Sequence, residues 1–191
     1  IGPGDVQWMT SGRGILHEEM PRRGPSGIID GFQLWVNLPA AQKMAVPRYQ
    51  EVSAASIPSV KKDGATVRLV AGGFDGTCGP VTEIAASPSY MEVSLSPASS
   101  FVISVPRGHT ALAYVFEGAG RFGAAGEMVE AVCMVVFDDG DQIEVQSEAG
   151  VRFMLIAGAP FGEPIVPYGP FVMNTADEIR LALFELRNGT F

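Results

Sequence analysis

Short apolar runs separated by turn residues recur along most of the chain. Each run is roughly 4–7 residues long, a length more typical of β-strands than of helices. Gly, Pro, Ser and Asp residues separate the runs, and this spacing predicts an all-β antiparallel sandwich or jelly roll. The strands that the pattern predicts are Phe32–Leu38, Val67–Val70, Tyr90–Leu95, Phe101–Val105, Ala111–Phe116, Cys133–Phe137, Gln142–Val145 and Arg152–Ile156.

One α-helix is predicted, at the C-terminal end of the sequence. Thr175 and Glu178 have the spacing of a capping box, in which the threonine hydroxyl and the glutamate side chain each accept a backbone N–H of the first turn. Asn188-Gly189 predicts the end of the helix. The residues that recur at helical spacing and form one apolar face are Ile179, Ala182, Leu183 and Leu186.

Residues 50–63 (QEVSAASIPSVKKD) are polar and contain Ser, Pro and a pair of lysines. This composition predicts an interdomain linker. The stretch from residue 64 to about 160 is long enough for one complete β domain.

Composition supports a turn-rich β protein, since 23 Gly and 14 Pro among 191 residues leave little room for long helices. The net charge of −8 argues against a basic surface for nucleic acid and leaves binding to another protein open. No apolar run approaches the ~18 residues of a membrane span, so no membrane contact is expected. The two cysteines, Cys78 and Cys133, fit a reducing compartment.

The first candidate for chemistry is the pair His17 and Glu19. If this segment is a strand, residues i and i+2 face the same side, so the imidazole and the carboxylate converge on one point. That donor pair suits iron, manganese or a similar divalent metal. The spacing is common by chance, so from the spacing alone a structural histidine or a surface ion pair is favoured over a metal site.

The remaining motifs are weaker. His109 lies in a turn before an apolar strand and has no histidine or carboxylate at i+2, which favours a structural role over an acid–base role. No P-loop, dinucleotide fingerprint or G-x-S-x-G motif is present in the sequence. Cys133 lies in an apolar run and is predicted to be an inert core thiol, whereas Cys78 is predicted to be exposed. The acidic turn 138–141 is predicted to be a solvated hairpin corner.

Long stretches of the sequence resemble the pirin family. The resemblance is carried at the N-terminal end by residues 3–21 (PGDVQWMTSGRGILHEEMP), 31–38 (GFQLWVNL) and 47–50 (PRYQ). Residues 106–118 (PRGHTALAYVFEG), 162–166 (GEPIV) and 168–175 (YGPFVMNT) carry it further along. Pirins are two-domain cupins of the jelly-roll class. The resemblance therefore implies a bicupin whose N-terminal barrel lacks its front part.

The resemblance also implies a division of the chain. Residues 1–58 are expected to be the C-terminal part of the N-terminal cupin with its linker, and to carry half of the metal site. Residues 59–165 are expected to form the C-terminal cupin domain, and residues 166–191 a tail with the helix.

In the family, the N-terminal cupin binds a single non-haem iron through an H-x-H pair, a further histidine and a glutamate. Carried over, the last two ligands are His17 and Glu19, so the resemblance implies Fe(II), or another divalent metal, at these residues. The H-x-H pair is absent, because the only other histidine in the sequence is His109. The implied site is therefore incomplete.

Three functions follow from the resemblance. The first is a quercetin (flavonol) 2,3-dioxygenase, which would act on a small aromatic substrate and would be metal-dependent. The second is an iron- or redox-responsive transcriptional co-regulator that binds a protein such as a transcription factor in the cytoplasm or nucleus. The third is a degenerate cupin whose metal site does not work. The sequence leaves open whether the chain is an enzyme.

Overall fold

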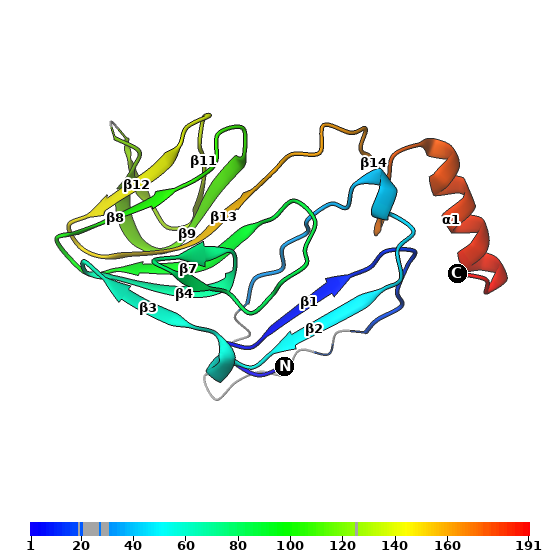
Figure 1. Ribbon diagram of the computed structural model, residues 1–191, viewed down its shortest axis with the longest axis horizontal. Coiled ribbons are helices and arrows are strands. Elements are labelled where there is room, and N and C mark those ends of the chain that lie inside the picture. Colours follow the sequence, from blue (N-terminus) through cyan, green and yellow to red (C-terminus); the bar gives the residue numbers. More distant parts are fainter. Residues whose placement is uncertain (19, 21–26, 28–30, 125) are drawn as a thin grey trace. The chain divides into compact units, whose positions relative to one another are not determined.

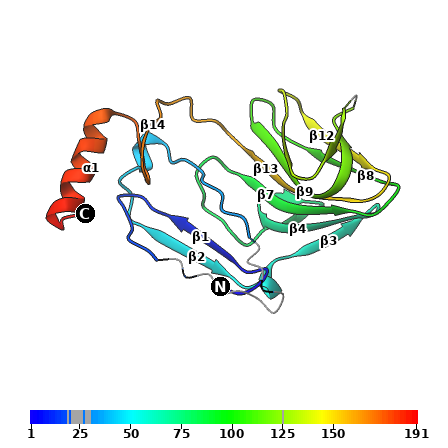
Figure 2. The same cartoon turned by 180° about the vertical axis from the view of Figure 1, so that it is seen from behind.

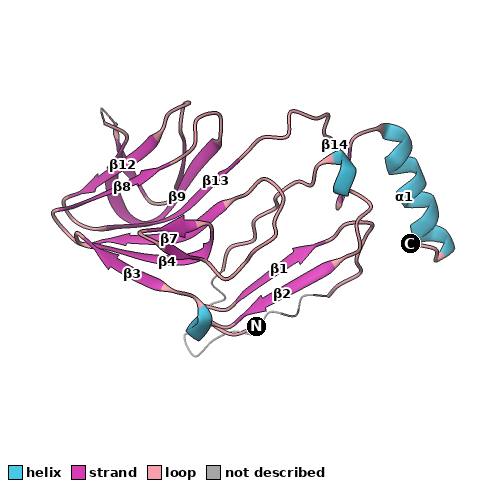
Figure 3. Ribbon diagram, viewed as in Figure 1, coloured by secondary structure: helices cyan, strands magenta, loops and turns pink. Residues whose placement is uncertain are grey.

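The computed structural model describes residues 1–18, 20, 27, 31–124 and 126–191. Almost all of its regular structure is β-strand, with one α-helix and two short 3-10 helices among the described residues (Figure 3). The elements are β1 (Val6–Thr10), η1 (Ala40–Gln42), β2 (Arg48–Val52), η2 (Ala54–Ser56), β3 (Ser59–Lys62), β4 (Ala65–Ala71), β5 (Gly73–Phe74), β6 (Thr77–Cys78), β7 (Ser89–Leu95), β8 (Ser99–Ser104), β9 (Thr110–Phe122), β10 (Met128–Glu130), β11 (Cys133–Val136), β12 (Gln142–Ser147), β13 (Val151–Gly158), β14 (Val166–Tyr168), β15 (Phe171–Met173) and α1 (Ala176–Asn188).

The chain divides into two compact units, and the first consists of residues 1–8 and 50–161. Its main sheet has the strand order β3-β4-β7-β13-β9-β12-β8, and β10 and β11 also pair with β9. The long strand β9 pairs with β13 and β11 over its first part and with β10 and β12 at its end. Strand β9 therefore joins the β13 side of the sheet to the β12 side. The sheet curls around an interior, as Figure 1 shows. The predicted all-β jelly-roll class is confirmed.

The interior of this unit is formed by side chains that alternate between the two faces of the central strands. In β7 and β13, Met91, Val93, Phe153 and Leu155 are fully buried, because every second side chain points inward. Aromatic rings fill the middle of the core, where Phe153 makes edge-to-face contacts with two other rings. The ring contacts in this core are Phe74–Phe101, Phe101–Phe153, Phe122–Phe153 and Phe122–Phe137.

Most predicted strands are confirmed as parts of β4, β7, β8, β9, β11, β12 and β13. The prediction for Phe32–Leu38 is wrong, because these residues have no regular structure. An extended segment becomes a strand only when a neighbour takes its backbone groups. No described strand pairs with this segment, and Phe32 and Trp35 are exposed instead of forming a buried face.

The second unit consists of residues 9–49 and 162–191. Helix α1 packs against the hairpin of β14 and β15 (Figure 2). The predicted capping box is confirmed, with the Thr175 hydroxyl accepting from the Glu178 N–H and the Glu178 carboxylate accepting from the Thr175 N–H. The helix ends at Gly189, whose φ of 66° is in the left-handed region that favours glycine. Ile179 is buried on the predicted apolar face, whereas Leu186 is exposed.

The segment predicted as a linker is structured. Residues 50–63 include the end of β2, the turn η2 and strand β3. Strands β1 and β2 form a two-stranded sheet. The domain boundaries at residues 58 and 165 remain a prediction. No helix in the described part of the chain is long and apolar enough to cross a membrane.

Candidate functional site

His17 lies in an irregular, exposed segment that follows β1. The strand expected for this segment is not formed at His17, so the face-sharing argument for an i, i+2 pair does not apply to its backbone. Glu19, the other predicted ligand, lies outside the described residues. Among the described residues, no group of three or more His, Cys, Asp or Glu side chains is placed to hold a metal ion.

The approach to His17 is held by two glycines within the second unit. Gly12 has a φ of 52°, and a Cβ at this position would lie 2.1 Å from the Ala45 carbonyl oxygen. This close approach brings the Arg13 N–H to the same oxygen, to which it donates at 2.9 Å. Only glycine combines this backbone conformation with this approach. The turn is therefore fixed five residues before His17.

The second glycine, Gly14, lies beneath the ring of Phe191. A Cβ on Gly14 would lie 2.2 Å from a ring atom of Phe191, and the φ of Gly14 is 131°. The Phe191 ring also contacts Phe171 edge-on, with 5.8 Å between ring centroids. The last residue of the sequence thus covers the backbone three positions before His17. Sequence reasoning missed this contact, because nothing in the pattern of residues links positions 14 and 191.

A buried lysine ties together the other segments of this unit. Lys43 is 5% exposed, and its Nζ donates to Asn37 Oδ1 at 2.5 Å and to the Val172 carbonyl at 2.8 Å. Burial lowers the pKa of Lys43, and the nearby carboxylates of Glu163 and Glu178 partly oppose that shift. Hydropathy alone does not distinguish this residue from an ordinary surface lysine, so its role is not predictable from the sequence.

The carboxylate of Glu163 reinforces the same connection. Its Oε2 accepts from the Ala40 N–H at 2.6 Å and from Asn174 Nδ2 at 3.3 Å. The residues around Lys43 are therefore held by hydrogen bonds to the segment before α1. These contacts hold together the backbone segments of the second unit. The hydrogen bond from Arg13 to Ala45 joins the segment of His17 to them.

The interior of the curled sheet in the first unit offers no alternative site. It is filled by packed aliphatic and aromatic side chains, and the buried residues of the described chain include no histidine, acid or cysteine. His109 lies at the rim, where its N–H donates to the Pro106 carbonyl at 3.2 Å in the predicted turn. The prediction that His109 lies in a turn is confirmed.

The acidic segment 138–141 is solvent-exposed, as predicted, but the prediction of a hairpin corner is wrong, because the segment connects β11 to β12 and these two strands do not pair with each other in the described structure. Arg107 Nη2 pairs with Asp141 at 2.9 Å, and the Gly108 N–H donates to Asp139 at 2.6 Å. Both carboxylates are exposed, and in the described residues they form no metal cluster. Arg107 therefore neutralises part of the negative charge of this segment.

The cysteine predictions had different outcomes. Cys78 is exposed as predicted. The prediction of a core thiol at Cys133 is wrong, because this residue is exposed as well. The reason is that β11 pairs with β9 alone in the described structure and therefore lies at an edge of the sheet.

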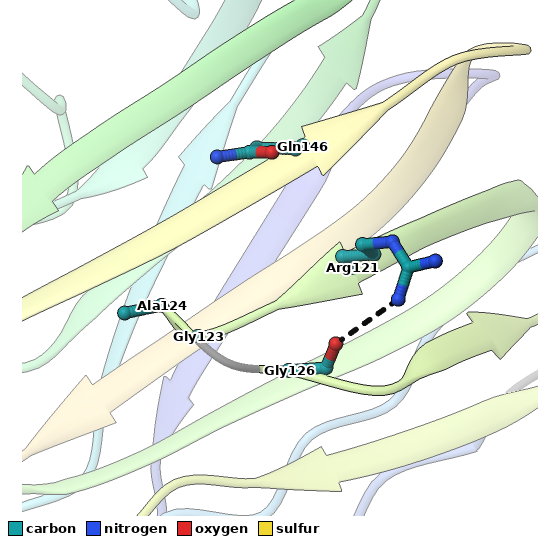
Figure 4. Close-up of a pocket in the computed structure, with 5 residues that line it drawn as sticks. All are labelled: Arg121, Gly123, Ala124, Gly126 and Gln146. Carbon is teal, nitrogen blue, oxygen red and sulfur yellow. Dashed lines mark hydrogen bonds between the residues drawn. The ribbon is translucent and has the colours of Figure 1, made fainter.

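A hollow of about 230 Å³ lies on the first unit between β9 and β12 (Figure 4). Its described lining residues are Arg121, Gly123, Ala124, Gly126 and Gln146. The Arg121 guanidinium donates to the Gly126 carbonyl at 3.4 Å. The described lining contains no carboxylate, imidazole or thiol, so it offers no general acid, base or nucleophile.

Comparison with known proteins identifies the family. Residues 90–191 match the family model described as the pirin C-terminal cupin domain, and residues 1–36 match the pirin model. The chain is 40% identical over 193 residues to a pirin-like protein of Caulobacter vibrioides, covering 100% of this chain and 69% of that protein. The chain belongs to the pirin family.

Two further relatives of this pirin have names that point to an activity. One is a Thermoplasma acidophilum protein whose name proposes a quercetin 2,3-dioxygenase, 37% identical over 209 residues, covering 100% of this chain and 80% of that protein. The other is the crystal structure of quercetin 2,3-dioxygenase from Acinetobacter baumannii. It matches with a TM-score of 0.86 and 32% identity, covering 98% of this chain and 67% of that chain.

The pirin described here spans about two thirds of the length of the curated relatives that it matches, with 65% to 70% of each covered. The match to the dioxygenase structure confirms the predicted cupin architecture. The activities of the full-length relatives are carried to this chain only as proposals.

Proposed function

We propose that this pirin is a metal-dependent oxidoreductase of the quercetin 2,3-dioxygenase type, acting on a flavonol or a similar small aromatic substrate. The observation that carries the proposal is the similarity of nearly the whole chain to the Acinetobacter baumannii quercetin 2,3-dioxygenase, at a TM-score of 0.86 and 32% identity. The Thermoplasma acidophilum relative supports the same chemistry through its name.

In this proposal His17 and Glu19 are metal ligands, and the metal is non-haem Fe(II) or another divalent ion. An imidazole with a carboxylate is a suitable donor pair for such a metal. The number of donors does not fit a complete site, because three or four protein ligands are usual and the described residues supply no cluster of three. A metal with an open position would supply Lewis-acid polarisation of the substrate oxygens.

The role of the rest of the chain in this proposal is to position His17. The turn at Gly12 and the ring of Phe191 over Gly14 restrict the backbone that leads to the imidazole. A ligand on an irregular segment needs such support, because a metal site tolerates little displacement of its donors. Gly12, Gly14 and Phe191 are therefore positioning residues.

A second candidate function is regulatory binding to a protein in the cytoplasm or nucleus. The net charge of −8 favours a basic protein partner over nucleic acid as the binding target. This function requires no turnover, so it is distinguished from the first by an activity measurement.

The enzymatic proposal is tested with the full 191-residue chain loaded anaerobically with ferrous iron and then mixed with quercetin and oxygen. We expect loss of flavonol absorbance that requires iron and falls at least about tenfold in His17→Ala. His109→Ala is the matched control and should retain wild-type activity, because this histidine lies in a turn of the other unit. Turnover that is equal in wild type and His17→Ala would contradict the proposal.

A further inference from the structure

Strand β11 has one open backbone edge. It pairs with β9 in the register Cys133↔Val115 to Val136↔Leu112, and no described strand pairs with its other side. Next to it, the N–H groups of Ala131 and Phe137 donate toward β9, to the carbonyls of Gly118 and Ala111. Backbone groups alternate between the two edges of an antiparallel strand, so Met134 and Val136 direct theirs away from β9. Two residues thus present hydrogen-bonding groups to a further strand.

The side chains along this edge are apolar and exposed. Met134 and Val136 are 52% and 71% exposed, and their alternate spacing in β11 places them on one face, while Val132 just before the strand is 68% exposed. On the opposite face, Val135 and Phe137 pack against the core of the sheet. An exposed apolar edge without a charged residue is unusual in a protein that does not use it for pairing.

Another edge strand of the same sheet gives a contrast. Strand β8 stands at one end of the strand order, and its outward positions are Ser100, Val102 and Ser104. Two of these three side chains are hydroxyls, so this edge is more polar than β11. The apolar character of β11 is therefore specific to that strand and is not shared by this second edge.

The charged residues on either side of β11 favour one kind of partner. Residues 131–137 (AVCMVVF) carry no charge, but Glu127 and Glu130 precede them and Asp138, Asp139 and Asp141 follow; Arg107 neutralises part of the second flank, and both flanks stay net acidic. Antiparallel pairing of two copies of β11 would bring the acidic flank of each copy against that of the other, which like-charge repulsion opposes. A segment with basic residues at its ends meets both flanks favourably.

We propose that β11 is a docking edge for an extended segment of another protein, with alternating apolar side chains and Lys or Arg at both ends, which adds to the sheet as a further strand. Main-chain hydrogen bonds to Met134 and Val136 provide the pairing, and the stripe of Val132, Met134 and Val136 covers the apolar side chains of the partner. The surface is independent of any metal at His17.

The test measures fluorescence anisotropy of two labelled peptides, KKVTVTVKK and EEVTVTVEE, titrated with the full chain at low and high ionic strength. We expect the basic peptide to bind at least about tenfold more tightly than the acidic one, and to weaken as salt screens the acidic flanks. Met134→Lys and Val136→Lys should each weaken its binding about tenfold or more, because each places a charge on the docking stripe. Val102→Lys, on the contrasting strand β8, should bind like wild type.

Circular dichroism of each variant verifies that the fold is kept. Two separate β11 variants are used so that the test still works if one of them does not fold. The proposal is wrong if the basic peptide does not bind, if both peptides bind equally, or if Val102→Lys weakens binding as much as the β11 variants do. Sedimentation of the wild-type chain alone tests whether a second copy of the chain occupies this edge instead. A reversible dimer that Met134→Lys dissociates would overturn the proposal and assign the edge to a second copy.

Discussion

At the scale of single residues, this pirin depends on a few close contacts that its hydropathy pattern does not reveal. Gly14 is the clearest example, since its backbone conformation and the ring of Phe191 both exclude a side chain. Lys43 is another, because its buried ammonium group holds Asn37 and the Val172 carbonyl together. Gly14 and Phe191 are far apart in the sequence, and so are Lys43 and Val172.

Gly14→Ala is expected to lower the free energy of unfolding by about 1–3 kcal/mol, because it adds backbone strain and a clash with Phe191. The matched control is Gly76→Ala, where φ is also positive at 76° but no atom lies within 4 Å of the added Cβ. Urea unfolding of both variants measures the difference.

A double variant isolates the clash from the strain. Combining Gly14→Ala with Phe191→Ala should cost less than the sum of the single changes, with a coupling of about 1 kcal/mol. Strict additivity of the two changes would show that the ring of Phe191 does not restrict Gly14.

At the scale of elements, the ion pairs on the curled sheet join neighbouring strands. Glu92 on β7 accepts from Arg68 on β4 at 3.1 Å and from Arg152 on β13 at 2.6 Å. Arg152 also pairs with Glu117 on β9 at 2.6 Å. The hydrogen bond with Glu92 is the main cause that raises the pKa of Arg152. Glu92 therefore links three strands, whereas Glu117 is a terminal member of the cluster.

Glu92→Gln is expected to reduce the free energy of unfolding by about 1–3 kcal/mol, because it weakens two charge-assisted hydrogen bonds of a carboxylate that is only 17% exposed. Glu117→Gln is the control and should cost about 0.5 kcal/mol or less, because that side chain is 63% exposed. Chemical denaturation compares the two variants, and equal losses would contradict the central role of Glu92.

The sequence predicted those elements whose local pattern agrees with their tertiary environment. In strands such as β7 and β13, apolar residues alternate with polar ones or follow one another, because the sheet buries these strands. Helix α1 has its own capping residues at both ends. Residues 32–38 have the same apolar character but no described strand to pair with, so the local pattern misled. Cys133 was misplaced for a related reason, since local sequence does not show whether a strand is central or at an edge.

The candidate site was predictable only in part. The types and spacing of His17 and Glu19 suggest metal ligands, and the family resemblance strengthens that suggestion. The structure describes His17 on an exposed segment, and the supports at Gly12, Gly14 and Phe191 arise from tertiary contacts that no local motif encodes. The partner groups that would complete a metal site are likewise not determined by this motif.

At the scale of the whole molecule, the chain is a pirin-family cupin protein with two candidate functional features in different units. The first unit has a filled interior and an open apolar edge at β11. The second carries the loop of His17. Metal chemistry and protein docking are therefore expected to respond to different substitutions.

The central claim is that His17 and Glu19 bind a metal. The most direct test incubates the purified chain with ferrous iron without oxygen and measures bound iron per chain, beside His17→Ala, Glu19→Ala and the control His109→Ala. We predict more bound iron per chain in wild type and His109→Ala than in His17→Ala and Glu19→Ala, at less than full occupancy because two protein donors hold a metal weakly. Wild-type iron no higher than in His17→Ala and Glu19→Ala would contradict the claim and favour a cupin without a working metal site.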